Sequence, residues 1–142
     1  MSRVIRSLTT LAVLVAALAC SSTTAPQSNE GTYTMVALNG FALPATVSGI
    51  DYAGTYQWRV VAGTLILRAD GSYTETLNIR SYHAGVLESD YQTVEQGTYV
   101  VSRMAITFNS NAAYSYTGSV ANGNLSYNTS SGQWLAQYRR IS

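Results

Sequence analysis

The side chains able to do acid–base or nucleophilic chemistry are few and scattered. The chain holds one histidine, His83, with Ser81 and Asp90 nearby in the sequence. A hydrolase triad needs a nucleophile, a base and a carboxylate that orients the base. No Gly-x-Ser-x-Gly segment supplies the exposed serine of such enzymes. We therefore expect His83 to be an ordinary surface residue and the protein not to be an enzyme.

Metal ligands are equally sparse. Glu88, Asp90 and Glu95 are close in sequence, but their spacing is not that of a calcium-binding loop. One histidine and one cysteine cannot complete a zinc site. A glycosidase needs two opposed carboxylates, and seven acidic residues always offer some pair, so that signal is weak. We expect no bound metal and no cofactor.

One carboxyl group stands out by its position in a strand pattern. Glu75 falls between Tyr73 and Leu77, on the side of the strand that alternation assigns to apolar residues. A carboxyl group is costly to bury unless it is paired, hydrogen-bonded or wet. Glu75 then either lines a ligand cavity with Tyr56, Trp58 and Tyr73, or sits near a rim where it reaches water or a tyrosine hydroxyl. The second interpretation is the simpler one.

The only cysteine ends a segment typical of export signals. Arg3 and Arg6 precede an unbroken apolar run over 11–18, and Ala-Leu-Ala at 17–19 leads into Cys20. The run is shorter than the ~20 residues that span a bilayer. The segment resembles the lipobox of bacterial lipoproteins, in which the cysteine is acylated and becomes the first residue of the mature chain. It departs from that pattern at Ala17, where leucine is usual.

The lipobox resemblance implies a domain organisation. We expect a helical lipoprotein signal peptide over residues 1–19, which is removed by cleavage. The lipidated Cys20 then begins a polar, flexible tether over 20–30. The domain proper covers 31–142. Acyl chains on Cys20 would hold the protein on a membrane, each buried methylene contributing about 0.8 kcal/mol. No other cysteine remains to form a disulfide.

The same resemblance implies a location. Bacterial lipoproteins with Asp after the cysteine tend to stay in the inner membrane, and here Ser21 follows Cys20. We expect a protein of the cell envelope that faces away from the cytoplasm, on the outer membrane if the cell has two membranes.

Charge argues against nucleic acid as a partner. Removing nineteen residues from 142 leaves 123, enough for one domain with a hydrophobic core. The eight arginines lose Arg3 and Arg6 and become six, against seven Asp and Glu, and there is no lysine. A nearly neutral chain without clustered basic residues offers phosphate groups little attraction.

Composition and periodicity predict an all-β domain. Eleven tyrosines, eleven glycines and only two prolines are typical of strands separated by turns. Apolar residues alternate with polar ones throughout 31–142, and none recur at helical spacing over three turns. We predict about eight or nine antiparallel strands in an up-and-down β-barrel, since closure removes exposed edges. The acidic segment 83–95 is expected to be a long hairpin arm or a surface loop.

Two turns fix the register of their hairpins. A two-residue loop at Asp70-Gly71 would put the flanking apolar residues on opposite faces, whereas a three-residue loop with a bulge at Gly71 pairs Leu67 with Tyr73. A two-residue turn at 122–123, Asn-Gly, pairs residue 120 with 125 and residue 118 with 127. That second register lets the ring of Tyr127 cover Gly118.

Short phrases in a recurring order resemble the small lipocalin-like domains of bacterial lipoproteins. They lie at 31–44, 62–73, 97–108, 118–125 and 138–140. The chain departs from that family at Arg103-Met104, where a glycine-containing turn is common. The resemblance implies a small barrel whose apolar interior holds a ligand, and it carries no fixed catalytic residues.

Two functions follow, from different classes. The first is a lipid-anchored, monomeric binding barrel for a small apolar or amphipathic ligand, with Tyr56, Trp58, Tyr73 and Glu75 as candidate ligand contacts. The alternative is a protein-interaction module of the envelope, such as an assembly partner or protease inhibitor, with a filled barrel and no ligand. It would expose an apolar patch around Tyr114, Tyr116 or residues 41–50.

Overall fold

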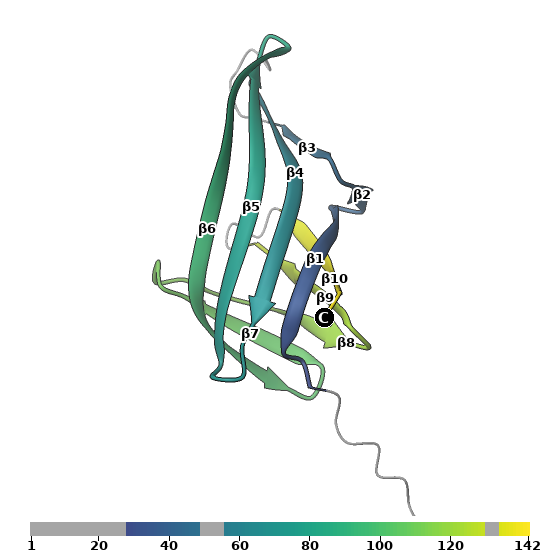
Figure 1. Ribbon diagram of the computed structural model, residues 1–142, viewed down its shortest axis with the longest axis vertical. Coiled ribbons are helices and arrows are strands. Elements are labelled where there is room, and N and C mark those ends of the chain that lie inside the picture. The colour runs from purple at the N-terminus through teal and green to yellow at the C-terminus, as the bar shows by residue number, and fades with distance from the viewer. Residues whose placement is uncertain (1–27, 49–55, 130–133) are drawn as a thin grey trace, which may run out of the picture.

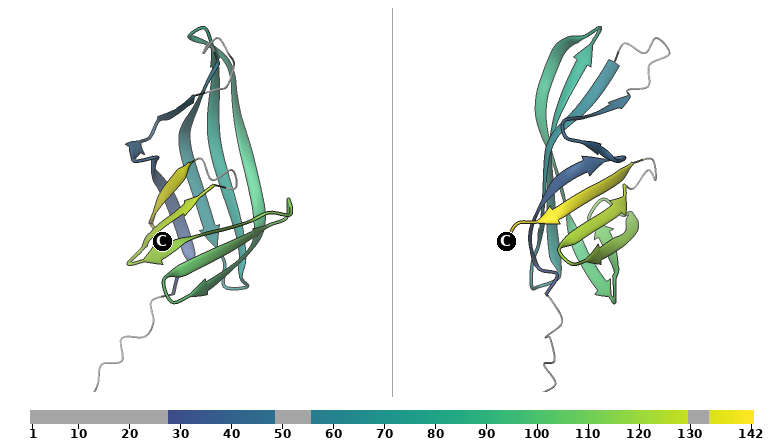
Figure 2. Two further views of the ribbon diagram at one scale, coloured as in Figure 1. Left: turned by 180° about the vertical axis from the view of Figure 1, so that it is seen from behind. Right: turned by 90° about the vertical axis from the view of Figure 1, so that its right-hand side faces the viewer.

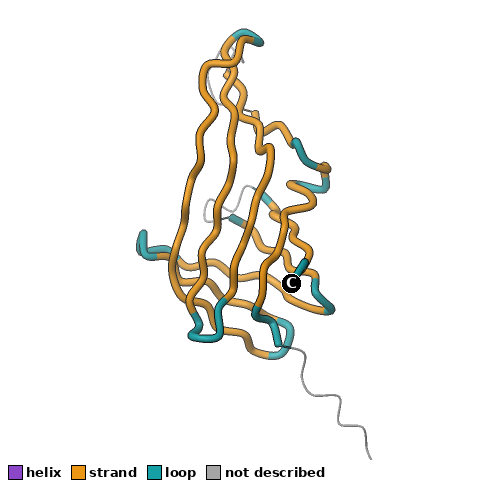
Figure 3. Tube along the Cα trace, viewed as in Figure 1, coloured by secondary structure: helices purple, strands orange, loops and turns teal. Residues whose placement is uncertain are grey.

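The computed structural model describes residues 28–48, 56–129 and 134–142, so the expected signal peptide and Cys20 lie outside the described residues. Within these ranges all the regular secondary structure is β-strand, joined by loops and turns (Figure 3). The ten strands are β1 (Gly31–Leu38), β2 (Phe41–Ala42), β3 (Ala45–Ser48), β4 (Tyr56–Leu67), β5 (Ser72–His83), β6 (Val86–Ser102), β7 (Ala105–Ser110), β8 (Ser115–Ala121), β9 (Asn124–Asn128) and β10 (Leu135–Arg140).

Eight of the strands close into an antiparallel barrel, as predicted (Figure 1). Each strand from β4 to β10 pairs with the next, β10 pairs with β1, and β1 closes the ring against β4. That closing seam joins Gly31–Thr34 to Leu67–Thr64. The described strands exceed the predicted eight or nine because two short ones, β2 and β3, add to β1 and β4 beyond the seam.

Three strands run well past the closed part of the barrel. β4, β5 and β6 have 12, 12 and 17 residues, and β6 pairs with β7 only through residues 97–102. We call the projecting part the arm: residues 45–48, 56–63, 77–83 and 86–94 (Figures 1 and 2). The acidic segment 83–95 is therefore a hairpin arm, with a turn at Ala84 and Gly85 that both have positive φ.

A bulge keeps one face of the long sheet continuous with the barrel interior. Between Val60 and Ala62 the register of β4 against β5 slips by one residue. Odd-numbered residues of β4 such as Leu65 face the interior below the bulge, so the even-numbered Trp58 and Tyr56 face the same side above it.

Both register predictions are confirmed. Leu67 pairs with Tyr73 across the turn in which Gly71 has φ 80°. At the second turn Asn122 and Gly123 have φ 51° and 74°, as a type I′ hairpin requires, and Gly118 pairs with Tyr127.

The turn between β6 and β7 contains no glycine. Ser102 pairs with Ala105, so Arg103 and Met104 form a two-residue turn. Arg103 itself takes the left-handed conformation, with φ 59°. A non-glycine residue is strained in that conformation.

Aromatic side chains fill the closed barrel. The ring of Phe108 packs against Tyr73, Tyr116 and Tyr127 at centroid distances of 4.9, 5.2 and 5.1 Å. The largest fully buried side chains are Tyr33, Tyr73, Tyr138, Phe108, Leu65, Leu67, Ile106 and Leu125. This part of the interior is a packed core, as expected of a barrel with eight strands.

Substituting Gly118 should destabilise the barrel. A Cβ atom there would lie 2.1 Å from the backbone oxygen of Ser126 and 2.6 Å from the Cβ of Tyr127. We expect Gly118→Ala to lower the free energy of unfolding by about 1–3 kcal/mol, measured by urea denaturation. Ser119→Ala, at an exposed position on the same strand, should change it by less than about 0.5 kcal/mol. Equal effects of the two substitutions would contradict the predicted clash.

Candidate functional site

Two glutamates face each other across neighbouring strands inside the barrel mouth. Glu75 on β5 is the direct register partner of Glu95 on β6. Alternation puts both on the same side of the sheet as Tyr73, which points into the core. Like charges directly opposite each other destabilise a sheet, so this pair needs other partners.

Tyrosines from the far side of the barrel hold Glu75. The hydroxyls of Tyr127 on β9 and Tyr138 on β10 both donate to one oxygen of Glu75, Oε1. The residue is 7% exposed. Its other oxygen, Oε2, accepts no hydrogen bond from the described residues. Glu75 is therefore interior, as the cavity interpretation expects, and it is bonded to tyrosine hydroxyls, as the alternative interpretation expects.

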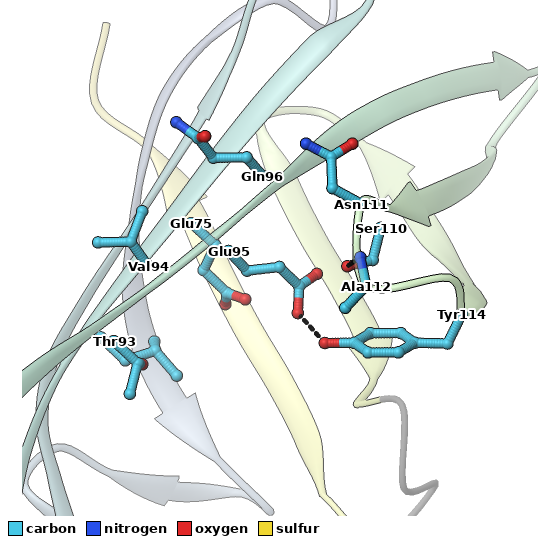
Figure 4. Close-up of a pocket in the computed structure, with 10 residues that line it drawn as sticks. Glu75, Thr93, Val94, Glu95, Gln96, Ser110, Asn111, Ala112 and Tyr114 are labelled. Carbon is cyan, nitrogen blue, oxygen red and sulfur yellow. Dashed lines mark hydrogen bonds between the residues drawn. The ribbon is translucent and has the colours of Figure 1, made fainter.

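Glu95 has a second set of tyrosines. The hydroxyls of Tyr73 and Tyr116 each donate to its Oε1 at 2.5 Å, and Tyr114 donates to its Oε2 at 2.6 Å (Figure 4). The hydroxyls of Tyr73 and Tyr116 also lie 3.3 Å apart. Five tyrosines thus serve two carboxyl groups, and the two sets meet at the β5–β6 ladder.

Burial shifts the proton affinities of this network. Burial raises the pKa of Glu75 above its ordinary value of 4.5, the hydrogen bonds from Tyr127 and Tyr138 oppose that shift, and the neighbouring Glu95 adds to it. Burial also raises the pKa of Tyr127 and Tyr138 well above 10. The tyrosines therefore remain protonated and act as hydrogen-bond donors.

An open pocket lies against the two carboxyl groups. Its volume is about 500 Å³, within the range of small-ligand sites. β5 and β6 form one side and the turn between β7 and β8 forms the other (Figure 4). None of the residues that line it is basic: Glu75, Leu77, Thr93, Val94, Glu95, Gln96, Ser110, Asn111, Ala112 and Tyr114. The pocket is acidic on one wall, with an aromatic ring on the other.

The four predicted ligand contacts fall in two places. Tyr73 and Glu75 lie in the barrel, at the carboxyl network. Tyr56 and Trp58 lie on the arm, each 38% exposed, and the ring of Tyr56 stacks on His83 at 4.3 Å. All four share one face of the sheet, but the structure does not gather them in one pocket.

The residues considered first for chemistry lie apart from the pocket. His83 is exposed near the arm tip, with Nδ1 3.5 Å from Glu88 Oε1. Asp90 forms an ion pair with Arg80 at 2.8 Å, and the hydroxyl of Ser81 bonds that of Ser89. In the part of the chain that the structure describes, no three His, Cys, Asp or Glu residues come close enough to hold a metal ion.

Most of the site does not follow from the local sequence pattern. Glu95 ends the acidic segment predicted to be a hairpin arm or a surface loop, and nothing in the pattern links the inward-facing tyrosines of β8, β9 and β10 to a carboxyl group. The sequence does carry a signal: alternation puts Glu95 on the same face as Tyr99 and Val101, which pack against the core.

Comparison with known proteins finds no matching family model, no matching curated protein and no matching solved structure. None of the described segments forms a helix of the length and hydropathy that crossing a membrane takes.

The raised pKa of Glu75 predicts how stability depends on pH. The folded protein binds this proton more tightly than the unfolded chain, so the contribution of Glu75 to stability falls as pH rises above 4.5 through its raised pKa. The groups that face it are Glu95, Tyr127 and Tyr138.

The free energy of unfolding, measured by denaturation at a series of pH values, should therefore decline in the wild type relative to Glu75→Gln. Glu88→Gln makes the same change on the exposed arm and provides the baseline. Parallel profiles for the wild type and Glu75→Gln would contradict the burial of a titrating carboxyl group.

Proposed function

We propose that this protein is a lipoprotein, anchored through acyl chains on Cys20, whose barrel binds a small amphipathic ligand outside the cytoplasm. The observation that carries the proposal is the pocket at the barrel mouth, where a buried carboxyl group has one oxygen without a hydrogen bond. A few convergent polar groups beside apolar surface are typical of small-molecule sites.

The packing of the core favours a ligand at the barrel mouth over one at the closed end. Phe108 and its tyrosine neighbours occupy the closed end of the barrel, so a ligand there would have to displace them. The mouth differs, because the arm continues only one side of the barrel beyond the seam (Figure 2). A ligand would lie between the pocket and the inner face of the arm.

A protein-interaction module is the second candidate, and one observation favours it. Among the described strands, residues 86–94 of β6 pair with β5 alone. Their side chains Val86, Leu87 and Val94 are each at least half exposed. Such an edge is a template for pairing with an added strand. An exposed apolar patch was expected around Tyr114 and Tyr116 or around residues 41–50. Tyr116 is buried, and Phe41, in the second region, is 71% exposed.

Ligand binding is tested by mass spectrometry of extracts from the full chain purified from its own cell envelope. We expect a defined small amphipathic compound at near-stoichiometric amounts, reduced by Glu95→Gln and retained by Glu88→Gln, because Glu95 lines the pocket and Glu88 does not. An empty wild-type protein would contradict this proposal. A stoichiometric envelope protein in that empty sample would favour the interaction module.

Anchoring is tested by fractionating cells that express the wild type or Cys20→Ser. We expect the wild type in the outer-membrane fraction of a bacterium with two membranes, with the mass of acyl chains on the peptide that begins at Cys20. The variant should leave that fraction, because no other cysteine can be acylated. A wild type that carries no acyl mass would contradict the lipoprotein proposal.

A further inference from the structure

We propose that the ligand of this pocket is an organic cation with an apolar tail: its ammonium group binds at Glu75 and Glu95, and its tail lies along the inner face of the arm. This inference rests on the proposed function, and it specifies the chemical class of the ligand.

The charge of the pocket selects a cation. Two carboxyl groups contribute to its lining, and no lining residue is an arginine or the histidine. Two basic side chains of the arm have acidic neighbours outside the pocket: Arg80 pairs with Asp90, and His83 lies beside Glu88. An anion here would meet like charge without compensation, whereas an ammonium group would supply the missing positive charge.

The hydrogen bonds leave a site for an ammonium donor. Tyr127 and Tyr138 both bond Oε1 of Glu75, which fixes the carboxyl group and leaves Oε2 to accept from a ligand. Tyr73 and Tyr116 fix Oε1 of Glu95, and Oε2 accepts from Tyr114 with room for a second donor, because a carboxylate oxygen accepts two hydrogen bonds. Acceptors held rigid before binding cost little entropy to engage.

An aromatic wall completes the recognition of a cation. Tyr114 lines the pocket opposite Glu75, and its hydroxyl bonds Glu95 (Figure 4). The face of a tyrosine ring attracts ammonium groups, and the attraction grows as water is excluded. Carboxyl groups and one ring around a cavity thus match the chemistry of an amine.

The arm adds an apolar track that begins at this acidic row. The next inward-facing residues of β5 beyond Glu75 are Leu77 and then Ile79. Ile79 pairs with Val60 on β4 and with Tyr91 on β6. Trp58 lies one step beyond. At about 3.3 Å per residue, Ile79 is roughly 13 Å from Glu75 along the strand.

The exposure of that track fits a bound tail. Val60 is buried, but Tyr91 and Trp58 are 41% and 38% exposed on a face that continues the barrel interior. Aromatic rings left half exposed beside an acidic pocket are suited to cover an alkyl or aryl chain of roughly this length. Head and tail therefore have separate, adjoining sites.

The test compares three probes with the same tail and different heads. The full chain is placed in phosphatidylcholine nanodiscs, with empty discs as the blank, and titrated calorimetrically with 4-phenylbutylammonium, 4-phenylbutan-1-ol and 5-phenylpentanoate. We expect the cation to bind at least tenfold more tightly than the alcohol, and the anion to bind more weakly than both.

Substitutions assign that preference to the pocket. Glu75→Gln and Glu95→Gln keep the side-chain shape, and each should reduce the preference for the cation over the alcohol at least fivefold. Glu88→Gln, on the same strand as Glu95 but outside the pocket, should leave the preference unchanged. Trp58→Ala should weaken all three probes alike, since it removes contact with the tail and not with the head.

The outcomes separate the two proposals. Equal affinity for the cation and the alcohol, or a preference that survives both Glu→Gln substitutions, would overturn the cation inference and leave an amphipathic ligand in place. Failure of every probe to bind, in a wild type whose extract is also empty, would overturn the proposed function itself. Circular dichroism of each variant confirms that a lost preference reports on the pocket and not on unfolding.

Discussion

Two carboxyl groups at the barrel mouth, Glu75 buried and Glu95 partly buried, set the constraint on which the rest of the interior depends. Glu75 and Glu95 are register partners, and within the described residues both carboxyl groups are bonded by tyrosines and not by a basic side chain. Their polar atoms must be satisfied by neutral donors, and tyrosine supplies a donor on a ring that also packs as core. That requirement accounts for five of the eleven tyrosines: Tyr73, Tyr114, Tyr116, Tyr127 and Tyr138.

The same network connects strands that do not pair directly. Glu75 on β5 bonds Tyr127 on β9 and Tyr138 on β10, residues 52 and 63 positions later in the chain. The hydrogen bonds therefore cross the barrel interior and supplement the ladder that runs around its wall. Loss of the Glu75 carboxyl group would remove the acceptor of the buried Tyr127 and Tyr138 hydroxyls, which is costly inside a packed core.

Local features of this fold were predictable from sequence, and contacts across the barrel were not. The Asn122-Gly123 turn and the bulge at Gly71 follow from which residues tolerate positive φ, and the flanking alternation then fixes the register. The pairing of Glu75 with tyrosines depends on how β9 and β10 are staggered when the sheet closes, and periodicity carries no information about that stagger. The sequence therefore identified Glu75 as unusual without identifying its partners.

The arm explains why the candidate ligand contacts were divided. Tyr56 and Trp58 share the interior face through a bulge near Val60, but they lie above the seam that closes the barrel. Alternation assigns a side chain to a face and cannot say how far along that face the barrel remains closed. The result is a packed lower half, an acidic pocket at its mouth and a half-exposed apolar face beyond it.

The most direct test of this account is a pH titration of the side-chain carboxyl carbons in protein labelled with ¹³C at glutamate. The account predicts that the Glu75 signal titrates with a midpoint above 4.5, and that Tyr138→Phe raises this midpoint further by removing a hydrogen bond that favours the ionised form. A midpoint at or below 4.5 that Tyr138→Phe leaves unchanged would contradict it, because such a carboxyl group would be in water and not held inside the barrel by tyrosines.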